Sequence, residues 1–329
     1  MGDVLRVISY CHQGVDKDQT SNTERLENLN TLVDTLTEKR IKDVDAIVLP
    51  GGYLYLDNLD IDKKSLNKSA IVKDLHSILS PLHKTSPNTN LIIGIDTKPE
   101  EKHQRIIGGQ QIALALDFNN VTGVGRKICP VQEDFDGLQY PVMLVHEKDF
   151  YDDRRYAKLS PNKLALLCAC YDMFGFVDAK RANIQRMRNI ILLEDINGNL
   201  HEGRDAFVYF KEVIQPRFDK LFKENEQNIV LATANIHRFE RTPKESFWHR
   251  HGIASASAAF NGCMSIAAAH FEQLPKDSDK GTLCAANVAT SHLEQAGHRK
   301  LHSHKPDHAF YIKSQKGAET AGLARVFKV

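Results

Sequence analysis

The chain has 329 residues, and 43 Lys and Arg against 42 Asp and Glu leave a formal charge of +1 with neutral histidines. Hydrophobic residues make up 42% and charged residues 26%, which fits a globular protein and excludes disorder, collagen and coiled coil. The balanced charge gives no overall attraction to nucleic acid or to an anionic membrane, so neither is an expected partner.

Neither a long apolar run typical of a transmembrane helix nor a signal-peptide pattern is found in the sequence. Six cysteines in such a chain are expected to be free thiols, because disulfides form mainly in secreted proteins. We therefore expect a cytoplasmic location.

The first half of the chain alternates short apolar runs with amphipathic segments. Runs of apolar residues predict buried strands at 4–10, 45–49 and 91–95. Apolar residues spaced as one helical face predict helices at 26–36 and 70–79. Alternation of this kind is typical of an α/β layered fold.

The second half continues the same pattern. Residues 106–116 predict a strand pair or a bulged strand, and three later segments predict strands, at 164–170, 229–234 and in the tail sequence AFYIK. Helical patterning is expected at 181–193 and 206–222. The simplest organisation is one domain over 1–329 with an insertion near 176–228.

Cys170 is the first candidate for chemistry, because it ends a predicted buried strand, where α/β folds place ligands and catalysts. An ordinary thiol has a pKa of about 8.5, so a nucleophilic role requires a nearby base or cation. Lys127 could supply the cation and stabilise an oxyanion, and Glu133 follows in the next loop. Taken singly, Cys170 is also consistent with a small buried apolar residue, Lys127 with a solvated lysine and Glu133 with a loop carboxylate.

The order of these segments resembles the nitrilase, or carbon–nitrogen hydrolase, superfamily. The resemblance rests on VDAIVLPGGYL, LIIGI, GRKICPVQEDFDG, KLALLCACYDMFGF and IVLATANIHRF, with 43 residues from Lys127 to Cys170. It implies a four-layer αββα sandwich and a cysteine hydrolase of an amide or nitrile. Cys170 would be the nucleophile, Lys127 would stabilise the oxyanion, and Glu133 would support Lys127. It also implies a small-molecule substrate, no cofactor or metal, and a homo-oligomer.

One departure from the family pattern affects the expected mechanism. The family places its general base, a glutamate, directly after the proline of the PGG segment, and here that position is Gly51. The expected substitutes are Asp57, Asp60, His12, His249 or His251. Without a base, the alternative is a catalytically degenerate member that serves as a binding or assembly subunit.

Two further readings of the sequence stay open. VDAIVLPGG also resembles the start of glutamine-amidotransferase-like proteins, although their motifs lie closer together than Pro50 and Cys170 do. His298, His302, His304 and His308 form a spaced cluster. We expect a polar loop there, because Pro306 would interrupt a helix, with a zinc site as the alternative.

Overall fold

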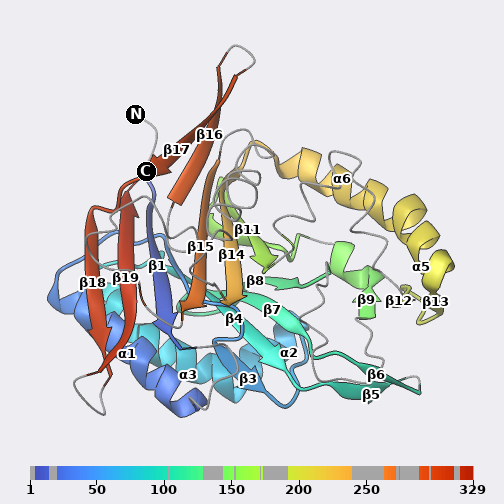
Figure 1. The fold of residues 1–329 in the computed structure, drawn as a ribbon, viewed down its shortest axis with the longest axis horizontal. Helices are drawn as coiled ribbons and strands as arrows, with labels where there is room; N and C mark the ends of the chain where they lie inside the picture. The colour runs from blue at the N-terminus through green and yellow to red at the C-terminus, as the bar shows by residue number, and fades with distance from the viewer. Residues whose placement is uncertain are drawn as a thin grey trace.

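The computed structural model describes residues 4–14, 21–102, 104–128, 144–151, 153–170, 172, 192–238, 263–271, 274, 289–295, 298–314 and 319–328. They form an α/β structure built around one large sheet (Figure 1). The helices are α1 (Asn22–Glu38), α2 (Lys63–Lys68), α3 (Ala70–Leu79), α5 (Gly203–Tyr209) and α6 (Gln215–Asn225), with a π turn at Phe210–Ile214. The π turn ends two residues before Pro216, which lacks the N–H that a regular α-helical hydrogen bond would need.

The strands of the first part of the chain are β1 (Arg6–Gln13), β2 (Ala46–Val48), β3 (Leu54–Leu56), β4 (Asn90–Thr97), β5 (Glu100–Lys102), β6 (Arg105–Ile107), β7 (Gln111–Leu116), β8 (Val121–Arg126), β9 (Leu144–His146), β10 (Tyr156–Ser160) and β11 (Lys163–Ala169). Those of the second part are β12 (Leu192–Glu194), β13 (Leu200–Glu202), β14 (Ile229–Arg238), β15 (Met264–Phe271), β16 (Ala289–Gln295), β17 (His298–His304), β18 (His308–Lys313) and β19 (Thr320–Lys328).

The large sheet divides into two halves at β1. Its strand order is β10–β11–β14–β15–β1–β2–β4–β7–β8. β1 pairs with β19 over Arg6–His12 and with β15 only at His12 and Gln13, so its neighbour changes along its length. The last strands of the path, β8 and β10, contact each other, so the two halves lie face to face.

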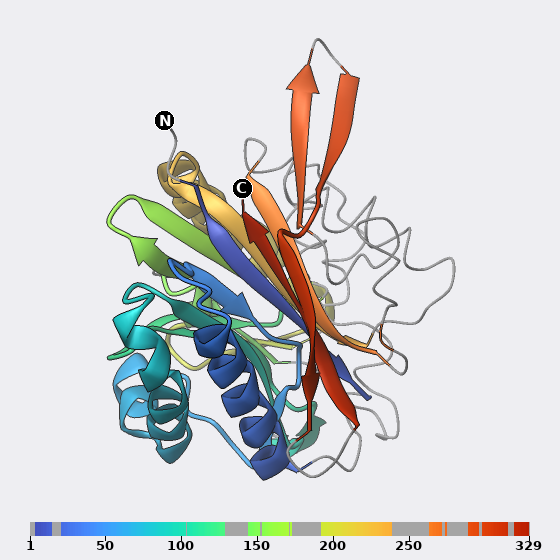
Figure 2. The same ribbon diagram turned by 90° about the vertical axis from the view of Figure 1, so that its left-hand side faces the viewer.

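Side-chain alternation along the strands creates three large apolar cores and therefore four layers. In β1, Ile8 packs under α1 and α3, whereas its neighbour Val7 points between the two sheet halves. In β11, Cys168 faces the helices α5 and α6, whereas Ala169 points between the halves. Figures 1 and 2 show the two helix layers on different sides of the sheets. The predicted αββα order is confirmed.

Two sequence expectations need correction. Leu192 and Leu193, expected in a helix, belong to β12, which pairs with β9 and β13; the rest of that expected helix lies outside the described residues. The four histidines expected in a polar loop lie in β17 and β18, because these segments pair with β16 and β19. The alternating apolar residues at the end of the described chain belong to β19, which pairs with β1 and β18 in the chain's own sheet.

Candidate functional site

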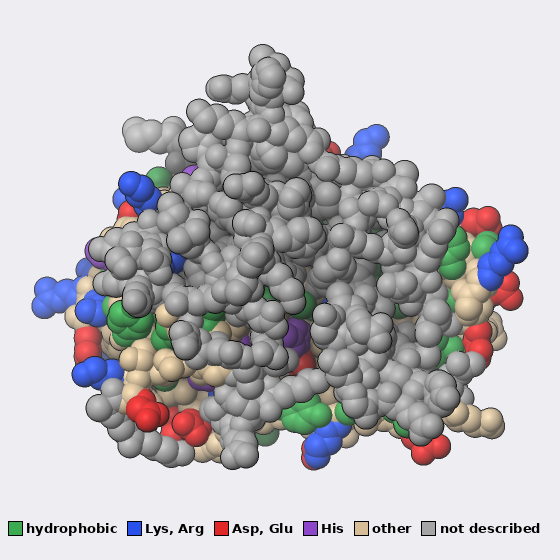
Figure 3. All heavy atoms as spheres, in the orientation of Figure 1, with side chains coloured by type: hydrophobic (Ala, Val, Ile, Leu, Met, Phe, Trp, Pro, Cys, Tyr) green, Lys and Arg blue, Asp and Glu red, His purple; other side chains and the backbone are tan. Residues whose placement is uncertain are grey.

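Six neighbouring strands end at the same edge of the sandwich. β11, β14, β15, β1, β2 and β4 are parallel, and their carboxyl ends carry polar residues in a setting that is otherwise apolar. The residues are Cys170, His237, His270, His12 and Asp96, together with the Pro50-Gly51-Gly52 turn. Figure 3 shows histidine side chains in the middle of one face, near the carboxyl end of β14. This edge is where α/β sheets place their sites.

Cys170 follows the last residue of β11 and has a left-handed backbone. Its φ is 48°, and this conformation costs a residue with a Cβ atom about 1–2 kcal/mol. The amide N–H of Cys170 donates to the carbonyl of Asn235 in β14, 2.9 Å away, and this bond helps to hold the turn. The side chain is 9% exposed. Strained residues of this kind cluster at active sites, so the turn singles out Cys170 among the described cysteines.

His237 and Asp96 form an ion pair that joins the two halves of the sandwich. His237 lies in β14 of one half and Asp96 in β4 of the other, and Nε2 of His237 is 2.9 and 3.0 Å from the two carboxylate oxygens. Burial lowers the pKa of His237, but the charge and hydrogen bond of Asp96, and then the hydrogen bond and charge of Cys170, raise that pKa well above its usual value. The imidazole is therefore bound to a carboxylate through Nε2, and the Cys170 thiol lies close enough to influence its pKa.

The glycine pair after Pro50 makes room for this imidazole. A Cβ atom on Gly51 would lie 2.7 Å from Nδ1 of His237 and 2.7 Å from the carbonyl oxygen of Asn235. A Cβ on Gly52, whose φ is +59°, would lie 3.2 Å from Cδ2 of His237. The imidazole thus occupies the space beside position 51.

Replacing Gly51 with alanine is expected to displace His237 and to destabilise the fold by about 1–3 kcal/mol, the usual range for overpacking a filled core. We expect thiol reactivity and hydrolysis to fall together with the melting temperature. Gly198→Ala is the control, because a Cβ there meets nothing within 4 Å. The control should lose some stability through its φ of +83° and keep full activity. Unchanged activity in Gly51→Ala would contradict this packing argument.

Hydrogen bonds from three elements hold the Gly51–Gly52 turn. Nε2–H of His270, in β15, donates to the carbonyl of Gly51 over 3.0 Å. Burial, and then the charges of His12 and Arg25, lower the pKa of His270 well below its usual value, so this imidazole is neutral at pH 7. Arg25 in α1 donates to the carbonyls of Gly52 and Tyr53. The N–H of Gly51 also donates to the carbonyl of Ile236 in β14, so two strands of one sheet half and a helix fix the turn.

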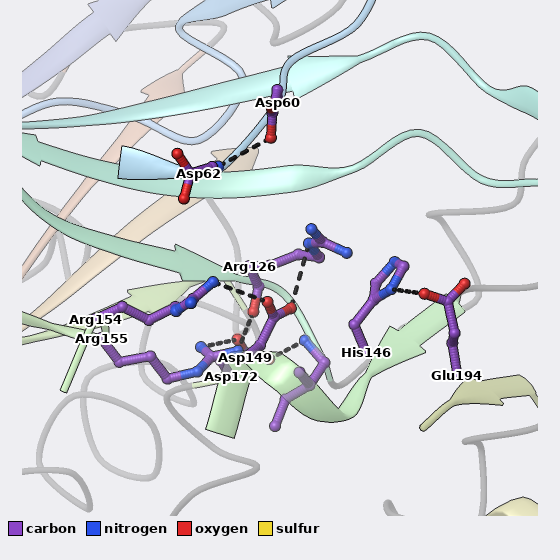
Figure 4. Close-up of polar contacts among 10 residues, drawn as sticks. Asp60, Asp62, Arg126, His146, Asp149, Arg154, Arg155, Asp172 and Glu194 are labelled. Carbon is purple, nitrogen blue, oxygen red and sulfur yellow. Dashed lines mark hydrogen bonds and ion pairs between the residues drawn. The ribbon is translucent and has the colours of Figure 1, made fainter. Parts of the chain in front are cut away.

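Lys127 lies directly after β8 and is 1% exposed. The segment that follows it is tied to the segment after Cys170, because the N–H of Ile128 donates to Oδ1 of Asp172 over 2.9 Å. Arg155 is 3.4 Å from Oδ2 of the same carboxylate (Figure 4). Asp172 thus connects the chain around Lys127 with the chain around Cys170. Glu133, the third predicted site residue, lies outside the described residues.

Three of the substitutes that we proposed for the missing base lie among the described residues. Asp57 is exposed and pairs with Lys98, and Asp60 accepts the N–H of Asp62. His12 packs against the rings of Tyr53 and His270. His249 and His251 lie outside the described residues. Sequence reasoning missed His237 and Asp96, although each stands at the end of an apolar strand that we did predict.

The fold is similar to solved structures of nitrilase-superfamily amidases and carbon–nitrogen hydrolases. One is a double mutant of the amidase from Nesterenkonia sp. AN1 in complex with acrylamide, with 11% identity over 99% of this chain and 90% of that chain at a TM-score of 0.44. Another is a carbon–nitrogen hydrolase from Helicobacter pylori G27, with 12% identity over 98% and 89% at 0.44. A third is a glutamine-dependent NAD+ synthetase from Acinetobacter baumannii, with 10% identity over 93% and 46% at 0.42.

No protein-family profile matches the sequence, and no curated protein matches it. Among the described residues, no helix is long and apolar enough to cross a membrane.

Proposed function

We propose that this protein is a cysteine hydrolase of carbon–nitrogen bonds in small amides or nitriles. The observation that carries the proposal is the alignment of Cys170, His237 and Asp96 at the carboxyl ends of three strands. A thiol, an imidazole and a carboxylate in this order form the arrangement that activates nucleophiles in unrelated hydrolases. The raised pKa of His237 favours the imidazolium, which in turn favours the thiolate of Cys170.

In the acylation step, the thiolate of Cys170 attacks the carbonyl carbon of an amide. A C–S bond forms, and the π electron pair of the carbonyl moves onto oxygen. Lys127 donates a hydrogen bond to this oxyanion. The oxyanion then re-forms the carbonyl and breaks the C–N bond, and the leaving amine takes the proton from Nδ1 of His237. The products of this step are a thioester on Cys170 and a free amine.

In the second step, neutral His237 takes a proton from a water molecule as that water attacks the thioester carbon. The C–S bond breaks, and the acid leaves with Cys170 again as a thiolate beside imidazolium. Asp96 holds Nε2–H throughout, so that Nδ1 is the nitrogen that exchanges protons. Glu133 keeps its predicted role of supporting Lys127.

The rival function, a degenerate binding subunit, was motivated by the missing glutamate at Gly51. His237 fills the adjacent space and can serve as a base, which favours the hydrolase. A degenerate subunit needs neither a strained backbone at Cys170 nor the buried His237–Asp96 ion pair close to this residue.

The proposal is tested by the reactivity of the thiol and by capture of the acyl-enzyme. We expect iodoacetamide to alkylate Cys170 faster than Cys11, Cys168 or Cys263, as read by peptide mass spectrometry. With 4-nitroanilides of acetate and butyrate, an acyl adduct should form on the peptide that contains Cys170. Cys170→Ala should abolish the adduct, and Cys168→Ala, two positions earlier in the same strand, should keep it. Slow alkylation of all cysteines, together with no amide turnover, would favour the degenerate subunit.

A further inference from the structure

Asn235 is buried between the two sheet halves and takes no part in the proton transfers proposed for the site. It belongs to β14, which lies between β11 and β15 (Figure 1). Its paired neighbours on these strands, Ala169 and Ala268, both belong to the core between the halves, and Asn235 itself is 1% exposed. An amide buried among apolar groups costs free energy unless it is hydrogen-bonded, so its contacts indicate its role.

The side chain of Asn235 crosses from one sheet half to the other. Its Nδ2 donates to the carbonyl of Leu49 over 2.7 Å and lies 3.4 Å from the carbonyl oxygen of Ile92. Leu49 directly precedes the Pro50-Gly51-Gly52 turn, and Ile92 lies in β4, the strand that carries Asp96. One amide group therefore connects β14 with two strands of the opposite half, of which one leads to the turn and the other to Asp96.

The backbone around Asn235 holds both turns of the site. The carbonyl of Asn235 accepts the N–H of Cys170 over 2.9 Å, and the carbonyl of Ile236 accepts the N–H of Gly51 over 3.1 Å. At His237, the next residue, the register of β14 against β15 shifts. A shift of this kind locally disrupts the ladder of hydrogen bonds, so the course of β14 at His237 depends on contacts from other elements.

A second buried asparagine links the same sheet halves away from the site. Asn90 is the first residue of β4 and is 1% exposed, and its Nδ2 lies 3.4 Å from the carbonyl oxygen of Lys158 in β10. It stands six residues before Asp96 in an extended strand, which places the two residues roughly 20 Å apart at about 3.3 Å per residue. Asn235 differs from Asn90 because its own carbonyl also holds the turn of Cys170.

We propose that Asn235 is a positioning residue that aligns the thiol of Cys170 with the imidazole of His237. Its amide fixes β14 against the chain that precedes Gly51, and its carbonyl fixes the turn of Cys170. One residue therefore determines how the nucleophile and its acid–base partner face each other, and small displacements of reacting groups cost much of the rate. The inference rests on the proposed function for the roles of Cys170 and His237, whereas the contacts of Asn235 stand without it.

The test compares Asn235→Ala with Asn90→Ala, which removes the other asparagine bridge between the halves. Both variants should have lower melting temperatures than the wild type, because each loses buried hydrogen bonds. Only Asn235→Ala should lower kcat for amide hydrolysis, by about 10²-fold with KM nearly unchanged, because the substrate still binds while the reacting groups are misaligned. In this variant, the pH of half-maximal alkylation of Cys170 by iodoacetamide should also rise toward the ordinary thiol pKa of about 8.5. Asn90→Ala should keep the wild-type value.

Asn235→Leu serves where Asn235→Ala fails to fold, because it fills the space with an apolar side chain and still lacks the amide. Wild-type kcat and a wild-type alkylation profile in the folded variant, or equal changes in Asn90→Ala, would overturn the positioning role. The outcome is separable from the proposed function. Amide hydrolysis that is unaffected by Asn235→Ala would leave the hydrolase intact and remove this inference. A shifted alkylation profile in Asn235→Ala, in a protein that cleaves no amide, would do the reverse.

Discussion

Replacing His237 with alanine is expected to lower kcat/KM for amide hydrolysis by about 10²–10⁴-fold, the usual contribution of a positioned acid–base group. The variant loses both the base for water and the acid for the leaving amine. It also loses the imidazolium beside the thiol, so alkylation of Cys170 by iodoacetamide should require a higher pH than in the wild type. Added imidazole should restore part of the rate, because the substitution leaves a space of the right shape next to Gly51 and Gly52.

The controls for this variant separate chemistry from folding. His83→Ala removes an exposed histidine that packs on Phe118, and it should leave the rate unchanged. His237→Ala leaves the buried Asp96 without its imidazole, which is expected to destabilise the fold by about 3–5 kcal/mol. Where this variant unfolds, His237→Gln preserves a donor for Asp96 and still lacks a base. Wild-type rates in a folded His237→Gln protein would exclude His237 as the proton carrier.

Replacing Asp96 with asparagine is expected to lower kcat/KM by about 10²–10⁴-fold while leaving the shape of the site intact. The amide NH₂ of asparagine can donate to Nε2 of His237, which would move the imidazole proton to Nδ1. A neutral His237 in that tautomer cannot accept a proton from water. Because Asp96 raises the pKa of His237, the variant should also lose the imidazolium at lower pH, and the alkaline limb of its pH–rate profile should shift to lower pH.

The same substitution makes a separate prediction about stability. The pKa of His237 is raised in the folded protein above its unfolded value of about 6.5. The ion pair therefore contributes stability that is fully present below that value and is lost as the pH rises through the higher folded pKa. Melting temperatures measured across this range should fall with pH in the wild type and change less in Asp96→Asn. Identical profiles would show that Asp96 does not set the charge of His237.

The layered fold was predictable from the sequence because its signals are local. Each buried strand is a short apolar run, and α3 has the bounds that its apolar spacing and the following Pro81 indicate. The end of β11 likewise identified Cys170 from the residues on either side of it. The residues that we propose to activate this thiol could not be found in the same way, because Asp96 and His237 are 141 positions apart in the chain. Only the packing of the two sheet halves brings them together.

One signal for that pair was present in the sequence. Both residues stand at the carboxyl ends of predicted strands, in LIIGID and IVLATANIH, as Cys170 does. Gly51 was interpreted as the loss of a base, whereas the small size of the Gly51-Gly52 pair makes space for the imidazole of His237 from another strand. The histidines near 300 drew attention through their spacing, yet their segments are ordinary paired strands.

The pairing of β1 with β19 has a consequence for how the chain reaches its native state. The two strands come from opposite ends of the described chain, and Phe327 of β19 fills part of the core between the sheet halves. Contacts between such distant segments bring a large loss of chain entropy before they add stability, and chains rich in them fold slowly. During synthesis, the edge of β1 that pairs with β19 stays unpaired until β19 has left the ribosome. The candidate site at the carboxyl end of β1 is therefore expected to form late, after the chain has been made through β19.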